Sequence, residues 1–119
     1  MAVPRLKRRA EFLAVSAQRN MFRTPTLLVQ IRERPEEELP SVPVRVGFTA
    51  SRRVGIAVVR NRAKRRLRAL VDHEVPRFRW RSSIDMVLIA TSSTAVVSFS
   101  SIVHDFYLAL THFHLVETL

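Results

Sequence analysis

The chain has 119 residues, a formal net charge of +10, a hydrophobic fraction of 47% and no cysteine. Its length suits one domain with a core of its own, and its hydrophobic fraction argues against disorder. The lack of cysteine excludes disulfides, thiol catalysis and cysteine-based zinc sites, and it is typical of a cytoplasmic protein. No apolar run approaches the roughly 18 residues of a membrane span. We also expect no signal peptide, because no apolar run follows the first charges.

The positive charge is unevenly distributed along the chain. All 20 Lys and Arg residues lie at or before Arg81. This asymmetry predicts a basic binding surface built from the first two-thirds of the chain, with the C-terminal third as scaffold. A polyanion is the favoured partner, because each neutralised phosphate releases condensed counterions.

The first half of the chain predicts one helix and two strands. A helix is expected at residues 8–18, after a basic arm, because apolar residues recur there at helical spacing. A polar link at 19–25 leads to a strand at 26–32, whose centre is rich in β-forming residues. Residues 33–43 contain three prolines and four acids, which we interpret as a solvated, hairpin-type loop. A second strand follows at 44–50.

A strongly basic helix is predicted at residues 57–74, after a basic turn at 51–55. Six of the nine positions from Arg60 to Arg68 are Lys or Arg. The apolar residues nevertheless fall on one arc of the helix: Ile56, Val59, Ala63, Leu67, Leu70 and Val71. One helix can therefore bury an apolar stripe and present a cationic face to a polyanion. Such a face lacks the Trp and Phe of helices that insert into membrane surfaces.

The remaining elements complete a sandwich. Residues 77–81 alternate arginine with aromatics, which favours either base stacking or a connector whose aromatics pack on the core. A continuous apolar run at 84–90 predicts a central strand, and a helix at about 99–114 follows a Ser98 cap. The predicted order is helix, strand, strand, helix, strand, helix. We therefore expect an α+β fold, a small α/β sandwich, forming a single domain over residues 1–119.

Catalytic patterns are scarce in this sequence. No nucleophile elbow precedes any serine, and no phosphate-binding loop is present. The acids gather in the proline-rich loop, so a nuclease site with two metal ions is not indicated. The residues predict a domain that binds nucleic acid without cutting it. RNA is favoured over DNA, because cations spread around the helix suit a compact, folded RNA.

Four ordered segments resemble the bacterial ribonuclease P protein component. The string Arg60-Asn61-Arg62-x-Lys64-Arg65-x-x-Arg68 is similar to the family's "RNR" motif. Further similarity lies in an opening segment, a strand with its turn, and a later strand: Arg5-Leu-Lys-Arg-x-x-Glu-Phe12, Arg45-Val-Gly-Phe-x-x-Ser-Arg-Arg-Val-Gly55 and Asp85-Met-Val-Leu-Ile-Ala90. The resemblance covers most of the chain. It implies a ribosomal protein S5 domain 2-like fold with a left-handed crossover around the motif helix, against the usual right-handed rule.

The resemblance also implies a function. Family members assemble with a catalytic RNA that removes the 5′ leader of precursor tRNA, and the RNA carries the active site and its Mg²⁺ ions. The expected complex contains one copy of the protein, which itself has no catalytic or metal-binding residues. By position, the contacts to the catalytic RNA fall on Arg52, Arg53, Arg60, Asn61, Arg62, Lys64, Arg65, Arg66 and Arg68. Asn61 either reads an RNA group or caps the start of the helix.

The resemblance places a leader-binding cleft between the first helix and the sheet. The family typically lines this cleft with aromatics, and Phe12 matches one of them. Ser16 and Gln30 occupy two positions that are often aromatic, and we expect both to bind the leader. There, hydrogen bonding or a nearby aromatic such as Phe22 would substitute for stacking. The alternative is a general RNA-binding or ribosome-associated protein without a part in cleavage.

Overall fold

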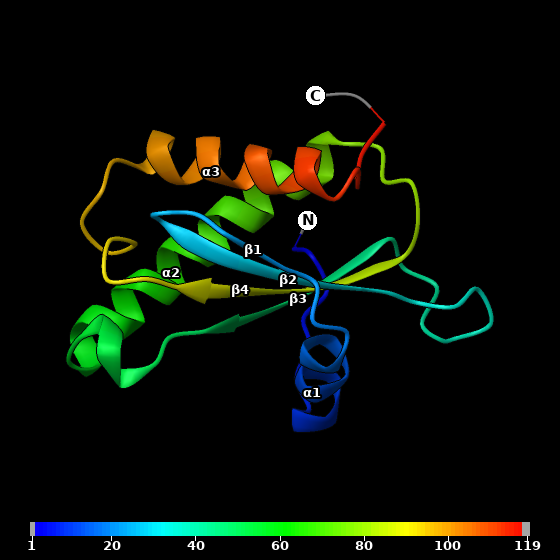
Figure 1. Cartoon of the computed structure of the whole chain (residues 1–119), viewed down its shortest axis with the longest axis horizontal. Helices are drawn as coiled ribbons and strands as arrows, with labels where there is room; N and C mark the ends of the chain where they lie inside the picture. Colours follow the sequence, from blue (N-terminus) through cyan, green and yellow to red (C-terminus); the bar gives the residue numbers. More distant parts are fainter. Residues whose placement is uncertain (1, 118–119) are drawn as a thin grey trace.

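Four strands form a single sheet flanked by three α-helices in a computed structural model of the chain, which describes residues 2–117 (Figure 1). In chain order the elements are α1 (Arg9–Ala17), β1 (Met21–Arg23), β2 (Leu27–Glu33), β3 (Val44–Thr49), the 3₁₀ turn η1 (Arg52–Val54), α2 (Ala57–Glu74), the 3₁₀ turn η2 (Val75–Arg77), β4 (Ile84–Ala90) and α3 (Phe99–His112). None of the helices between residues 2 and 117 is long and apolar enough to cross a membrane.

The strands lie in the order β1-β2-β4-β3. β4 pairs antiparallel with β2 and parallel with β3, so the chain crosses over through α2 between β3 and β4. The prediction of a hairpin-type loop at 33–43 is therefore wrong, because β2 and β3 are not neighbours. The apolar run of β4 makes it the strand best suited to burial, and it occupies the place between them.

The polar link predicted at 19–25 contains a strand that the sequence analysis missed. β1 pairs antiparallel with β2, with Met21 opposite Gln30 and Phe22 opposite Val29. Arg19 precedes it with a positive φ of 56°, which turns the chain back from α1. Three residues are too few to show strand alternation, so pairing with β2 rather than local pattern defines β1.

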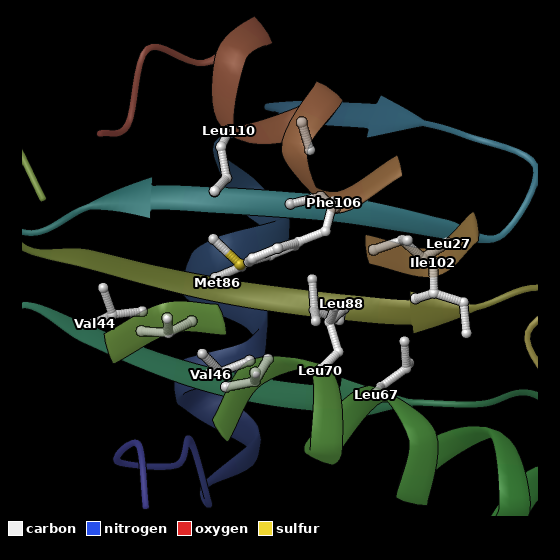
Figure 2. Close-up of a cluster of buried hydrophobic side chains, with 14 of the residues drawn as sticks. Leu27, Val44, Val46, Leu67, Leu70, Met86, Leu88, Ile102, Phe106 and Leu110 are labelled. Atoms are coloured by element: carbon white, nitrogen blue, oxygen red, sulfur yellow. The ribbon is translucent and has the colours of Figure 1, made fainter. Parts of the chain in front are cut away.

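The core lies between the sheet and the two later helices. α2 and α3 cover one face, where Leu27, Met86 and Leu88 meet Leu67 and Phe106 (Figure 2). α1 covers part of the opposite face and lies below the sheet in Figure 1, where Val15 packs with Leu6, Val87 and the partly buried Phe12. The predicted sandwich is confirmed, with an additional strand at its edge.

The two central sequence patterns translate directly into structure. α2 and β4 have the predicted bounds, and the apolar stripe of α2 is buried from Ala63 onward. The first two residues of the stripe differ: Val59 is partly buried, and Ile56, the N-cap residue, is 72% exposed because the helix begins only after it. Ser98 caps α3 as predicted, its Oγ accepting the Ser101 N–H at 3.3 Å.

The aromatic segment after α2 packs as a connector. The Phe78 ring meets Tyr107 edge-on, with ring centroids 5.5 Å apart. The Trp80 indole N–H donates to the Val75 carbonyl at 3.0 Å. Both aromatic side chains are partly buried against the core, while Arg79 is exposed. This arrangement agrees with the connector interpretation.

Candidate nucleic-acid interface

The outward face of α2 carries a row of exposed polar and cationic side chains. Asn61, Arg65 and Arg68 follow one another at i, i+4 and i+7, so they lie on one helical face, and Arg62 lies beside them. All four residues are exposed. The opposite side of the helix is fixed in the core by Leu67 and its neighbours. We call Asn61, Arg62, Arg65 and Arg68 the α2 face; it presents three positive charges on a rigid support.

Two other predicted RNA contacts on α2 are held by the protein itself. Arg66 donates from Nη1 to the Thr94 carbonyl at 2.7 Å and from Nη2 to the Val97 carbonyl at 2.5 Å. Arg60 donates from Nη1 to the Gly55 carbonyl at 3.0 Å. These bonds use part of each guanidinium, so Arg66 ties α2 to the loop before α3. Lys64 is partly buried on the flank of the helix.

Asn61 does not cap the helix. α2 begins at Ala57 and Ile56 is its N-cap, which places Asn61 inside the second turn. The capping hypothesis is therefore wrong, because a cap must precede the first helical residue. Among residues 2–117, the Asn61 side chain has no hydrogen-bond partner and is exposed. Its amide is free to bind an external group.

The basic turn before α2 presents two more arginines. Arg52 and Arg53 are exposed on η1, and Val54 anchors the turn in the core. Gly55 follows with a φ of 148°, a backbone conformation that residues other than glycine rarely adopt. This glycine lets the chain turn directly from η1 into α2, so the two arginines stand beside the start of the α2 face.

A pocket of about 460 Å³ joins this turn to the sheet face that carries α1. Arg53 and Arg23 contribute charge, and Leu28 and Ile89 form an apolar floor. Hydroxyl groups complete the lining, from Thr24, Ser51, Thr91 and Ser92. Such a lining suits a nucleotide, because cations and hydroxyls meet phosphate and ribose while the floor accepts a base. Arg23 was not predicted as a site residue, because the strand that carries it was not predicted.

The predicted cleft residues have different surroundings. Phe12 rests on the backbone of Gly47 in β3, where an added Cβ would lie only 2.4 Å from the ring. Gln30 is partly buried on β2 and pairs with Val87 on the same face. Ser16 is exposed on α1 and donates to the Leu13 carbonyl at 3.1 Å. The structure thus places all three on α1 or the sheet strands near it.

Phe22 cannot substitute for the missing cleft aromatics. It pairs with Val29 in the sheet, so it points to the core face rather than to the α1 face. Its ring stacks on His112 with centroids 4.4 Å apart and meets Phe113 edge-on. The sequence hypothesis for Phe22 is wrong, because the register of the unpredicted β1 determines the face.

The C-terminal end of α2 is fixed by a buried carboxylate. Glu74 accepts hydrogen bonds from the Tyr107 hydroxyl and the His73 ring, and Arg77 lies 3.6 Å away. Burial acts to raise the pKa of Glu74, but these bonds and the charge of Arg77 outweigh it and lower the pKa. The same contact raises the pKa of Tyr107. α2 is therefore anchored to α3 at this end, in addition to the bonds from Arg66 to the loop before α3.

The carboxylates near α1 form ion pairs with arginines. Glu11, Glu38 and Asp85 pair with Arg45 or Arg32. Across the described residues, no three His, Asp or Glu side chains gather in a way that could hold a metal ion. The three carboxylates near α1 are therefore engaged by arginines rather than left unpaired.

Comparison with known proteins identifies the family of this fold and surface. A family model described as Ribonuclease P matches residues 2–114. The chain belongs to the ribonuclease P protein family. It is 41% identical over 104 residues to a ribonuclease P protein component of Gluconacetobacter diazotrophicus, covering 85% of this chain and 83% of that protein. It is 39% identical over 106 residues to another of Paramagnetospirillum magneticum, covering 89% and 79% respectively.

Solved ribonuclease P proteins share the fold. A Staphylococcus aureus structure superposes with a TM-score of 0.74 at 19% identity, covering 95% of this chain and 97% of that one. A Thermotoga maritima structure gives 0.72 at 20% identity, covering 91% and 96%. The α+β fold implied by the resemblance is confirmed.

Proposed function

We propose that this chain is the protein subunit of ribonuclease P, which assists a catalytic RNA in removing the 5′ leader from precursor tRNA. The proposal rests chiefly on the α2 face, which lies within the segment that resembles the family's RNR motif. Three exposed arginines on a helix with a buried opposite side form a rigid cationic surface. Such a surface suits the phosphates of a folded RNA.

The two RNA partners would use different surfaces. The catalytic RNA binds the α2 face and the turn that carries Arg52 and Arg53. The leader, a single strand, lies along the sheet face beside α1, from Phe12 toward the pocket at Arg23 and Arg53. This division follows from the chemistry of each surface: exposed cations suit a folded RNA, while an apolar floor with hydroxyls suits unstacked bases.

The protein contributes binding and orientation. Its carboxylates near the leader surface are paired with arginines, so they are poor candidates for activating a water molecule. In this proposal the Mg²⁺ ions that supply the nucleophile are held mainly by the RNA. The arginines offset repulsion between two RNAs and thereby favour their association at low salt.

Reconstitution tests this proposal. Purified protein is mixed with precursor tRNA, with and without the RNA that copurifies from its own cells, at low Mg²⁺. We expect the protein alone to leave the precursor intact and the combination to release the leader at the mature 5′ end. Efficient cleavage by the protein alone would contradict the proposal. Equal affinity for unrelated structured RNAs would instead support the general RNA-binding alternative.

A further inference from the structure

A buried carboxylate on β4 gathers three arginines beneath α1. The Asp85 side chain is 1% exposed. Arg45 binds it through two bonds, from Nε to Oδ1 at 2.8 Å and from Nη2 to Oδ2 at 2.7 Å. Arg34, whose side chain is fully buried, donates to Oδ1, and Arg32 lies 3.7 Å from Oδ2. A buried charge needs such partners, since an unpaired one is costly.

Arg45 links Asp85 to α1 through Glu11. Its Nη1 donates to Glu11 Oε2 at 3.0 Å, while its other nitrogens hold Asp85. The other oxygen of Glu11, Oε1, accepts the backbone N–H groups of Lys7 and Arg8 at 2.8 Å each. One carboxylate therefore satisfies the start of α1 and binds it to the sheet.

Phe12 is the next residue after this anchor. Its ring lies on Gly47, which is two residues after Arg45 on the same strand. Side chains two apart on a strand point to the same face. Glu11 therefore contacts Arg45, and Phe12 lies on Gly47, at neighbouring positions on one face of β3. A shift of α1 that lengthens the Glu11–Arg45 contact also moves the ring of Phe12.

The same network holds the proline-rich loop. Arg34 donates to the carbonyls of Ile84 and Val42, and Arg32 makes two bonds to Glu38 at 2.9 and 2.7 Å. Arg32 and Arg34, which surround Asp85, are therefore held by both the loop and the strands, and this makes the attachment of α1 to the sheet rigid.

We propose that Asp85, acting through Arg45 and Glu11, is a positioning residue that sets where Phe12 stands on the sheet and thereby controls affinity for the leader. This inference rests on the proposed leader-binding function of the α1 face. Neither Asp85 nor Glu11 contacts the leader in this scheme. Their effect on binding passes through Phe12.

The first test compares two substitutions that each remove one negative charge. Glu11→Gln keeps an oxygen for the backbone of α1 but removes the ion pair to Arg45. Asp72→Asn is the matched control, because it breaks another arginine pair, Arg5–Asp72 at 3.0 Å, in which neither residue belongs to α1. The holoenzyme's preference for precursor over mature tRNA should fall about tenfold for Glu11→Gln, equivalent to ~1.4 kcal/mol, and stay unchanged for Asp72→Asn. Affinity for the catalytic RNA should be unchanged in both.

A double-mutant cycle with Phe12→Ala separates positioning from direct contact. If Glu11 acts through Phe12, then Glu11→Gln has little further effect once Phe12 is alanine. Additive losses would overturn the positioning mechanism, as would a Glu11→Gln variant with normal precursor preference. If Phe12→Ala itself leaves that preference unchanged, the proposed leader surface is wrong, which is a distinct result.

Hydrogen exchange of the free protein supplies a readout without RNA. Asp85→Asn and Glu11→Gln should both lower amide protection in α1, residues 9–17, whereas Asp72→Asn should not. Unchanged protection in α1 for both variants would overturn the inference even if leader affinity fell. A conservative Glu11→Asp substitution, which keeps the charge, should recover more protection than Glu11→Gln.

Discussion

Adjacent arginines on α2 should respond differently to the same substitution. Arg65 is exposed on the α2 face, whereas Arg66 donates two hydrogen bonds to the carbonyls of Thr94 and Val97. Arg65→Ala should therefore weaken binding of the catalytic RNA and reduce the slope of log K against log salt by about 0.7–0.9, the value of one phosphate contact. It should leave the free energy of unfolding almost unchanged.

Arg66→Ala should mainly cost stability. Hydrogen bonds to charged groups contribute about 1.5–3 kcal/mol each, and the partly exposed position of Arg66 lowers that value, so we expect a total loss of about 1.5–3 kcal/mol. Urea unfolding of the free protein measures this loss, and RNA titrations between 50 and 200 mM salt measure the slope. If Arg66→Ala flattens the salt slope as much as Arg65→Ala and leaves stability intact, the two arginines do not have the different roles assigned to them.

Three further substitutions test packing and charge. Leu67→Ala should cost about 2–5 kcal/mol in thermal or chemical unfolding, since Leu67 is 0% exposed in the core; an unchanged stability would contradict its burial. Gly47→Ala should cost about 1–3 kcal/mol through its clash with Phe12, and less in a Phe12→Ala background. Hydrogen bonds from the backbone of Arg8 and Lys7 lower the pKa of Glu11, so its stabilising effect is present above its unfolded pKa of about 4.3 and is lost as pH falls through the lower folded value. Glu11→Gln should accordingly make unfolding less sensitive to acid in that range, and an identical pH profile would count against the cap.

Periodicity predicted the elements that have strong local patterns. The stripe of α2 and the apolar run of β4 are long enough to define their own bounds, and both were predicted correctly. β1 was missed because its three residues acquire strand structure only by pairing with β2. The hairpin prediction failed for a related reason: nothing local in the 33–43 segment encodes the insertion of β4 between two consecutive strands.

The sequence predicted which residues contribute charge to the candidate site, but not the separate role of each residue. The sequence identifies the cations of α2, yet it cannot distinguish Arg65, which is exposed, from Arg66, which binds carbonyls 28 and 31 residues away. Nor could it place Asp85 beneath α1, since that arrangement depends on three strands meeting. Long-range hydrogen bonds and strand register determine these assignments, and neither leaves a periodic signal.

Crosslinking can locate each RNA on the protein and so test whether the two RNAs bind separate surfaces. A photoreactive amino acid is placed at Arg65 on the α2 face and, in a second variant, at Ser16 on α1, and each holoenzyme is assembled with precursor tRNA. We expect position 65 to crosslink to the catalytic RNA and position 16 to crosslink to the 5′ leader. Crosslinks from position 65 to the leader, or from position 16 to the catalytic RNA alone, would contradict the division into two surfaces.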